Sequence, residues 1–314
     1  MILPQNHRQF TYHHTMRKEF IMPRILFLLS ALLCIGATGD RALASARGQL
    51  APAPPVEPSS LFTIPTGRVA KSLDLEVSGS GILFGEESAS RLGSAVLGLG
   101  DIAQMELGTL GIVSSLESPN QLKSVAAGGL KVYLPLWKYG QGIAASFRRS
   151  GSFEEKAQGV TYEGKVGEFY TVVSLANFLT SAAAMAPDGG WKGIKIKTHV
   201  GIKYVDARLT HDQHRTQQSF WRPVGGLELW RKDSRARIMT ELGWNANFRP
   251  DNDGQIETIR VLMGGVRFFF SKHITFDVGV RHQSDYGGLS ESTLQTKLYM
   301  SIPTHALRDR IVGN

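Results

Sequence analysis

The chain has 314 residues, a formal net charge of +8 and a single cysteine, Cys34. The positive charge is small and dispersed, so the composition argues against a nucleic-acid-binding protein. One cysteine excludes a disulfide within the chain and any metal site built of several thiolates.

The first 44 residues predict a secretion signal. Basic residues between positions 17 and 24 precede the apolar stretch Ile25–Ile35, which is too short to span a bilayer. Small residues allow cleavage after residue 44 or residue 46. Removal of residues 1–44 deletes Cys34 together with five basic and two acidic residues, so the net charge falls from +8 to +5. No later stretch has the length of a transmembrane helix, so any further membrane contact must be made by strands.

Residues 45–66 predict a proline-rich linker or periplasmic arm. Five prolines occur in residues 47–67, at positions 52, 54, 55, 58 and 65. Such a segment favours an extended chain over a strand. We therefore expect the linker to lead into one β-rich domain that runs from residue 67 to residue 314.

From residue 67 onward, short alternating runs of apolar and polar residues are separated by Gly, Asn, Asp, Ser or Pro. These runs predict antiparallel strands. The predicted strands are 67–78, 100–113, 122–134, 141–150, 164–176, 191–206, 217–231, 234–248, 255–270, 272–283 and 291–302. Bacterial single-chain barrels use even numbers of strands. One further strand is therefore expected near 79–84 or 159–162, which gives twelve, with ten as the next alternative.

The connections in the C-terminal half alternate between short and long. Residues 231–234 and 271–272 are tight turns, whereas 207–217, 249–255 and 284–292 predict longer loops. This alternation is typical of an up-and-down barrel with tight periplasmic turns and longer outer loops.

Each predicted strand has one apolar and one polar face, because side chains of a strand alternate between its two sides. In residues 194–204, Ile196, Val200 and Ile202 oppose Lys195, Lys197 and Lys203. Residues 255–270 change parity between their two halves, and a β-bulge near Gly264-Gly265 would restore the alternation.

Alternation alone also fits a periplasmic β-sandwich binding protein. The runs, however, reach about fifteen residues, which exceeds the usual length of globular strands. The polar face mixes charged residues with glycines, and aromatic residues near the run ends resemble interfacial girdles. These aromatics are Trp137, Tyr139, Trp191, Trp221, Trp230, Trp244 and Phe248. We therefore favour an all-β transmembrane barrel with its apolar face toward lipid.

The chain resembles Gram-negative outer-membrane β-barrel proteins. The resemblance is carried by the signal, by residues 98–113 and 266–282, and by residues 293–302 as the closing strand. It implies an up-and-down antiparallel barrel in the cell outer membrane, in contact with outer-membrane lipid and inserted by the barrel assembly machinery. Such barrels often end on an aromatic residue, whereas this chain continues through residues 303–314.

The expected function is structural or pore- and transport-like, without a metal or another cofactor. If the barrel conducts, inward lysines favour anions, and inward acids offset them. The residues predicted to line the lumen are Lys195, Lys197, Lys203, Glu241, Asp277 and Arg281.

Residues 281–287 (RHQSDYG) carry an alternative function. They resemble the His-x-Ser-Asn stretch of outer-membrane phospholipase A and the lipid A deacylases, which implies a lipid esterase. His282 would then accept the proton of the nucleophile Ser284 at the outer end of a strand. Asp285 replaces the asparagine, and no third catalytic residue is assignable.

Two other motifs have simpler interpretations. Residues 251–254 (DNDG) resemble the start of a calcium loop, but the glycine comes too early and the closing glutamate is missing, so we interpret them as a hairpin turn. His211, Asp212 and His214 cluster in a predicted polar loop, for which a loop role is favoured over a metal site.

Overall fold

The computed structural model describes residues 57–83, 91–114, 122–137, 141–157, 160–176, 194–211, 214–231, 234–249 and 255–304. These residues belong to one compact unit within 50–314. The predicted signal and cleavage sites lie outside the described residues. Within the described part of the chain, no helix is long and apolar enough to cross a membrane.

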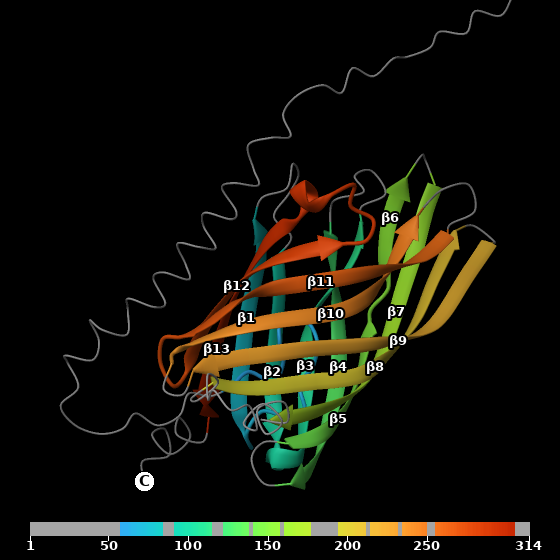
Figure 1. The fold of residues 1–314 in the computed structure, drawn as a ribbon. Helices are drawn as coiled ribbons and strands as arrows, with labels where there is room; N and C mark the ends of the chain where they lie inside the picture. Colours follow the sequence, from blue (N-terminus) through green and yellow to red (C-terminus); the bar gives the residue numbers. More distant parts are fainter. Residues whose placement is uncertain are drawn as a thin grey trace, which may run out of the picture. The chain divides into compact units, whose positions relative to one another are not determined.

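The described chain forms thirteen antiparallel strands (Figure 1). They are β1 (Asp74–Leu83), β2 (Arg91–Leu99), β3 (Ala103–Ser114), β4 (Leu122–Trp137), β5 (Gln141–Ser150), β6 (Phe153–Ala157), β7 (Val160–Ala176), β8 (Ile194–His211), β9 (His214–Arg231), β10 (Ala236–Arg249), β11 (Gln255–Phe269), β12 (Ile274–Gln283) and β13 (Thr293–Pro303). Two short 3₁₀ turns, η1 (Gly100–Ile102) and η2 (Leu289–Glu291), lie in connections.

Twelve of these strands close into a barrel. β1 pairs with β13, and β5 pairs with β7, so the sheet has no free edge at either closing position. The short β6 pairs with β7 beyond the end of β5, as a continuation of that strand. The predicted twelve-stranded antiparallel barrel is confirmed, and the alternative of a β-sandwich is wrong because the sheet closes on itself.

Several details of the predicted strands are wrong. The first strand begins at Asp74 rather than at residue 67. The missing strand is β2, whereas residues 79–83 continue β1 and residues 160–162 begin β7. The expected long loop over 207–217 is instead the paired ends of β8 and β9, which reach His211 and His214. Polar outward residues such as Gln217 make these strand ends look like a loop in the sequence.

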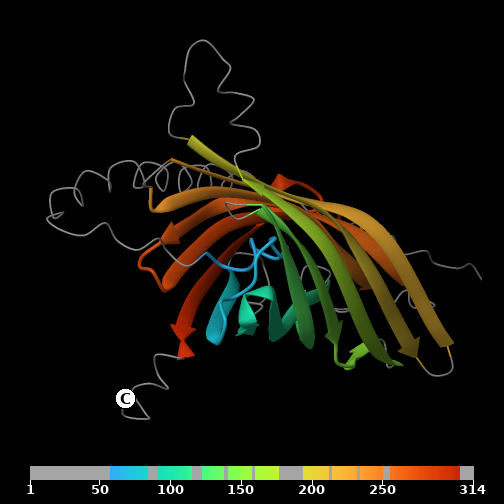
Figure 2. The same ribbon diagram turned by 90° about the horizontal axis from the view of Figure 1, so that it is seen from below.

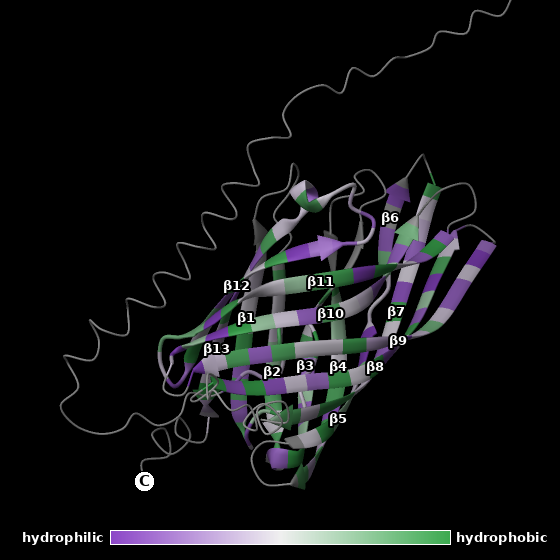
Figure 3. Ribbon diagram, viewed as in Figure 1, coloured by the Kyte–Doolittle hydropathy of each residue, from purple (hydrophilic) through white to green (hydrophobic). Residues whose placement is uncertain are grey.

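Apolar and polar residues alternate along the strands, as the stripes of Figure 3 show, and their burial places most charged residues on the inner face. On β4, Leu130, Val132 and Leu134 are exposed, whereas Lys131 between them is fully buried. On β8, Val200 and Ile202 are likewise exposed, although Ile196 on the same face is buried. Because the charged side chains point into the closed barrel, the exposed apolar face is the one suited to lipid.

The aromatic residues do not form one girdle. Trp221 lies on the outside, with its ring 4.8 Å from that of Tyr204. Trp230 instead stacks against Arg237, whose Cζ lies 4.3 Å from the ring centroid. Phe248 is buried. Trp221 therefore faces outward, as a girdle residue would, whereas Trp230 and Phe248 pack internally. Tyr139, Trp191 and the side chain of Trp137 lie outside the described part of the chain.

Residues 57–70 lie inside the barrel, and we call this segment the plug. Figure 2 shows it in blue within the concave side of the sheet. A bridge between Ser60 and Pro65 closes a tight turn, in which Leu61, Phe62 and Ile64 are buried. The last ten residues of the predicted linker, 57–66, are thus packed within the barrel.

The plug explains the change of parity in β11. The pairings of β11 with β10 and with β12 are continuous through Gly264 and Gly265, so the expected β-bulge is wrong. Val261 and Met263 point inward because they pack against Leu61 of the plug.

The ladder between β9 and β10 is short. We call the end where β1 begins and β13 ends the base, and the opposite end the rim. Only the base halves of these two strands pair, through Gly225–Leu229 and Ile238–Leu242. Toward the rim, the indole Nε1 of Trp244 donates a hydrogen bond of 2.8 Å to the carbonyl oxygen of Pro223. The parts of β9 and β10 on the rim side of Gly225 and Leu242 are unpaired with each other, and we call this stretch the seam.

The rim half of the β10–β11 hairpin packs inside the barrel rather than beside β9. Phe248 and Ile256 join a buried apolar cluster with inward-facing residues of β7, β8 and β9. The members of this cluster include Tyr162, Val166, Val205, Ala207, Leu209 and Phe220. The hairpin therefore narrows the lumen near the rim.

Candidate functional site

The predicted lumen residues lie on β8, β10 and β12, and five of the six are buried. Lys197, Lys203, Glu241, Asp277 and Arg281 are each between 1% and 6% exposed. Lys195, the second residue of β8, is exposed instead. Of the buried five, Lys197 and Glu241 contact the plug directly, and Asp277 does so through Arg267. Lys203 pairs with Glu168, Nζ to Oε1 2.6 Å, and Arg281 stands apart.

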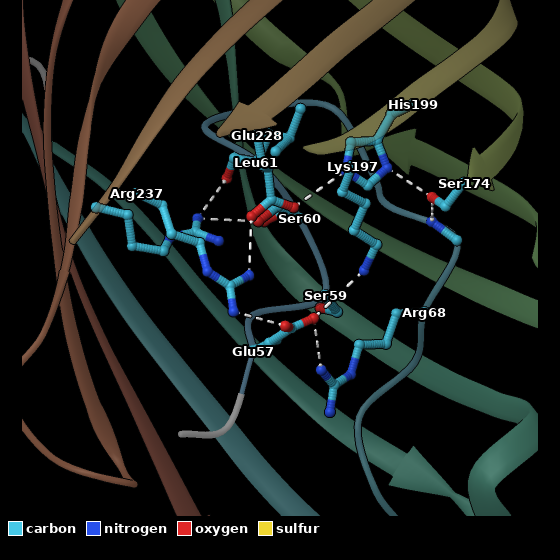
Figure 4. Close-up of polar contacts among 12 residues, drawn as sticks. Glu57, Ser59, Ser60, Leu61, Arg68, Ser174, Lys197, His199, Glu228 and Arg237 are labelled. Atoms are coloured by element: carbon cyan, nitrogen blue, oxygen red, sulfur yellow. Dashed lines mark hydrogen bonds and ion pairs between the residues drawn. The ribbon is translucent and has the colours of Figure 1, made fainter. Parts of the chain in front are cut away.

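The first anchor of the plug is its one acidic residue, Glu57. Its carboxylate lies 3.0 Å from Arg68 of the plug, 3.3 Å from Lys197 and 2.7 Å from Arg237 (Figure 4). Burial alone would raise the pKa of Glu57, but these three cations outweigh it and lower the pKa to about 2. Glu57 is therefore an anion that the barrel wall holds in place.

A chain of hydrogen bonds continues from this anchor across three strands. The N–H of Gly67 donates to Ser174 Oγ at 2.6 Å, and Ser174 Oγ lies 2.5 Å from His199 Nδ1. His199 Nε2 lies 3.0 Å from Glu228, which also accepts a bond of 3.1 Å from Arg237. The simplest assignment has Ser174 donating to Nδ1 and the Nε2–H group of a neutral His199 donating to Glu228.

The order of serine, histidine and acid resembles that of a hydrolase triad. Ser174 and His199 are fully buried, and the plug N–H group already occupies the serine oxygen. A nucleophile needs room for a substrate carbonyl beside it. With the plug in this position the arrangement serves as an anchor for Gly67.

Glu241 forms the second anchor. Its carboxylate accepts hydrogen bonds from the backbone N–H groups of Thr63, at 2.9 and 3.2 Å, and of Ile64, at 3.1 Å. The hydroxyl of Thr63 donates to the same carboxylate. These contacts satisfy the N–H groups of the plug turn, which would otherwise be buried without partners.

Cations bind the carbonyl groups of the same turn. Arg267 forms a bidentate pair with Asp277, at 2.7 and 2.8 Å, and donates 3.1 Å to the carbonyl oxygen of Ser60. Lys297 donates to Ser60 Oγ at 3.0 Å and to the carbonyl oxygen of Phe62 at 3.3 Å. On the other side of the barrel, Lys131 of β4 donates 2.7 Å to the carbonyl oxygen of Ser59, so the plug is held from several sides.

A cavity of about 150 Å³ with both polar and apolar lining lies against the plug. Ser59, Ser60, Phe62 and Thr63 form its plug side. The barrel side includes Arg281, Gln295 and serine and threonine hydroxyls of β1, β2 and β3, together with apolar side chains and the charged residues Glu76, Glu106, Arg148, Glu168 and Lys297. The rim positions of Arg281 and of the β2 and β3 residues place this cavity between the plug and the rim.

The alternative catalytic pair is not joined. His282 Nδ1 lies 3.1 Å from the hydroxyl of Ser292, whereas Ser284 Oγ accepts a bond of 3.0 Å from the backbone N–H of Arg260. Each member therefore has a different partner among the described residues, and their arrangement does not favour the proton transfer that ester hydrolysis needs.

Only part of the two motifs with metal-like composition lies within the described residues. His211 and His214 face each other at the end of β8 and β9, with ring centroids 5.4 Å apart. Residue 212 and the DNDG motif lie outside the described residues. Among the residues described, no group of three His, Cys, Asp or Glu could hold a metal ion.

Several site residues are absent from the sequence predictions. Ser174, His199, Glu228 and Arg267 lie at inward positions of predicted strands, so parity alone could have identified them. The plug was missed because its prolines outweigh the apolar residues 61–64 (LFTI). An apolar patch within a polar, proline-rich linker was the signal that this segment is buried.

No protein-family model matches the chain, and no curated protein sequence matches it. The structure is similar to the translocator domain of the autotransporter NalP from Neisseria meningitidis, with a TM-score of 0.36 and 10% identity over 73% of this chain and 85% of that one. OmpT of Vibrio cholerae with loop L8 deleted has a TM-score of 0.34 and 7% identity, over 73% of this chain and 98% of that one. CdiB from Acinetobacter baumannii has a TM-score of 0.31 and 8% identity, over 73% of this chain and 59% of that one.

The fold follows from the strand pairings of the chain itself. An even-numbered, closed antiparallel barrel with an apolar exterior and a polar lumen is the form in which bacterial outer-membrane proteins cross the bilayer. The chain thus has the fold of a membrane-spanning β-barrel, as its sequence predicts.

Proposed function

We propose that the protein is an outer-membrane channel that its own plug, residues 57–70, holds closed. The observation that carries this proposal is the chemistry of the contacts around the plug. Charged side chains of the wall, such as Glu241, Arg267 and Lys131, bind the plug backbone directly. In this proposal, outer-membrane lipid surrounds the exposed apolar face, and the barrel assembly machinery inserts the protein.

Charged contacts of this kind favour a removable plug over a permanent core. A protein hydrogen bond replaces a bond to water, so its net contribution to stability is only about 1 kcal/mol. If the plug leaves, the ionised wall side chains can be hydrated. The apolar cost comes mainly from Leu61, Phe62 and Ile64, at about 2 kcal/mol for each side chain that becomes exposed. A twelve-stranded barrel is wide enough to hold a narrow aqueous pore once it is emptied.

The lumen charge predicts weak ion selectivity for the open state. Among the described buried residues of the strands, seven bases face seven acids. The bases are Lys131, Lys197, Lys203, Arg237, Arg267, Arg281 and Lys297, and the acids are Asp74, Glu76, Glu106, Glu168, Glu228, Glu241 and Asp277. The anion preference expected from the lysines alone is therefore offset by these carboxylates.

Deletion of residues 57–66 tests the proposal in planar bilayers. We expect the full chain to be mostly closed and the deletion variant to conduct steadily, because its charged lumen fills with water. Heat-modifiable migration on a gel, compared with the full chain, shows whether the shortened barrel has folded. A folded deletion variant that conducts no more than the full chain would overturn the proposal.

A further inference from the structure

Arg281 is a buried cation whose described hydrogen bonds go to a neutral amide. Its side chain is 1% exposed, and its Nε and Nη2 atoms donate only to Gln283 Oε1, at 3.2 and 2.6 Å. Other lumen arginines are paired, since Arg267 lies 2.7 Å from Asp277 and Arg237 lies 2.7 Å from Glu57. Glu241 and Asp285 attract its charge, whereas its described hydrogen bonds reach only the neutral amide of Gln283.

An unpaired buried charge is costly, because a neutral amide oxygen does not replace the hydration that a guanidinium loses. Natural barrels can tolerate this cost where the charge serves a ligand. The Nη1 atom of Arg281 has no described acceptor, and the residue lines the cavity on the rim side of the plug. The guanidinium thus has hydrogen-bonding capacity next to open space.

The cavity contains other groups suited to a small polar molecule. Gln295 Oε1 is buried without a described donor, while its Nε2 donates 3.2 Å to Ser80 Oγ. The hydroxyls of Ser78 and Ser94 lie 2.7 Å apart on the same wall. A cavity of about 150 Å³ is the size that accommodates a molecule such as benzene, with about six non-hydrogen atoms.

The acids of the cavity do not oppose an anion at Arg281. Glu106 is paired with Arg148 at 2.7 Å, and Glu168 with Lys203 at 2.6 Å. In the backbone register of the sheet, Glu76 lies opposite Ser301 of β13, whereas Arg281 lies opposite Thr293 of the same strand. Eight residues of β13 separate those two levels, about 26 Å along the strand at 3.3 Å per residue.

We propose that this cavity binds a small solute bearing an oxyanion, a carboxylate or a phosphate, with Arg281 as the group that recognises the charge. The planar guanidinium donates two parallel hydrogen bonds to such groups, which gives both affinity and orientation. The hydroxyls and Gln295 contact the uncharged remainder of the solute. The inference deepens the proposed function by naming the class of solute. That the bound solute is also transported rests on the proposed channel function.

Binding is measured with the full, plugged chain in detergent. Sodium benzoate and inorganic phosphate are titrated separately by calorimetry, in a background of chloride at constant ionic strength. We expect saturable binding of one anion class, and the arm that saturates identifies the carboxylate or the phosphate. Arg281→Gln is expected to weaken it by about tenfold or more, the loss of one charge-assisted contact. Arg149→Gln, at an exposed arginine of β5, is the matched control and is expected to bind as the unaltered chain does.

A second measurement separates recognition from a structural role. Without the anion, Arg281→Gln is expected to be at least as resistant to urea unfolding as the unaltered chain, because an unpaired buried charge is removed. Absence of saturable binding of both anions overturns the inference, and so does equal affinity in Arg281→Gln or a marked loss of its resistance to urea. None of these results bears on the conductance of the barrel without its plug. The binding proposal and the channel proposal can therefore fail independently.

Discussion

Glu57 of the plug accepts a hydrogen bond of 2.7 Å from Arg237 Nη2 on β10, across 180 residues of sequence. Lys197 and Arg68 complete a set of three cations around this one carboxylate. The ion pairs between the barrel wall and the start of the plug therefore depend on the ionisation of a single side chain.

Acid is expected to loosen the plug. The pKa of Glu57 is lowered from its ordinary value of 4.5 to about 2, so its contribution to plug binding is complete above 4.5 and is lost as the pH falls toward 2. The shift corresponds to at most about 3 kcal/mol, or about a hundredfold in the population of the displaced plug. Channel recordings between pH 6 and pH 3 should show openings that become more frequent as the pH falls below about 4.5.

Glu57→Gln removes that dependence at its source. The variant is expected to open more often at pH 6 than the unaltered chain does, and to respond less to acid. Glu163→Gln, at an exposed acid near the rim end of β7, is the matched control and should retain the acid response. An acid response of unchanged size in Glu57→Gln would assign it to another group.

A disulfide between the plug and the wall is expected to keep the channel closed. A Cβ atom placed on Gly226 would lie 3.7 Å from Leu61 Cγ, the place that a cysteine sulfur takes, so Leu61→Cys with Gly226→Cys needs a shift of under about 1 Å. Cys34, the one native cysteine, lies in the predicted signal. After oxidation, acid should cause no openings, and a reducing agent should restore them. The single variant Leu61→Cys should open with acid whether or not it has been oxidised. Acid-induced openings while the disulfide is intact would contradict displacement of the plug.

A glycine on β12 provides the space for the plug aromatic. A Cβ atom on Gly279 would lie 2.7 Å from Phe62 Cζ, so Gly279→Ala should displace the ring and raise the open probability, at a cost of about 1–3 kcal/mol. Gly264→Ala is the control, because nothing lies within 4 Å of its Cβ position. In a Phe62→Ala background, recordings should show no further effect of Gly279→Ala. Persistence of the full effect there would place the strain elsewhere in the barrel.

The sequence predicts the strands well where one face meets lipid and the other meets charge. The alternation over Lys197–Lys203 survives in the structure because the wall separates these two environments, whereas Lys195 is exposed and Ile196 is buried at the start of β8. β2 was missed because its inward Val96 and outward Leu97 are both apolar, which removes the alternation. In β11, Val261 and Met263 break the pattern because they pack on the plug, a contact between residues about 200 positions apart that no local period reveals.

The candidate site was predictable only in part. Inward parity correctly places Lys197 and Glu241 among the buried residues, but their partners Glu57 and Thr63 lie in a segment whose prolines indicate a linker. The lone position of Arg281 is also invisible in the sequence, since it depends on which carboxylates reach it across the lumen.

The seam between β9 and β10 gives a last prediction, about local stability. Pro223 has no N–H group, and Trp244 Nε1 replaces a ladder bond at its carbonyl oxygen. Trp244→Phe removes this donor and leaves the carbonyl group without it, at a cost of about 1–3 kcal/mol. Hydrogen exchange should then become faster at the amides of 225–229 and 238–242, where the short ladder begins.

Trp221→Phe is the control for this change, because Trp221 faces outward in the same stretch of β9, two residues before Pro223. It should leave the exchange of both segments as it is in the unaltered chain. The β8–β9 ladder, which is continuous from Ile194 to His211, should stay protected in both variants. If Trp244→Phe left protection of 225–229 unchanged, the indole bond would not stabilise the seam, and the five-pair ladder would be sufficient to hold β9 against β10.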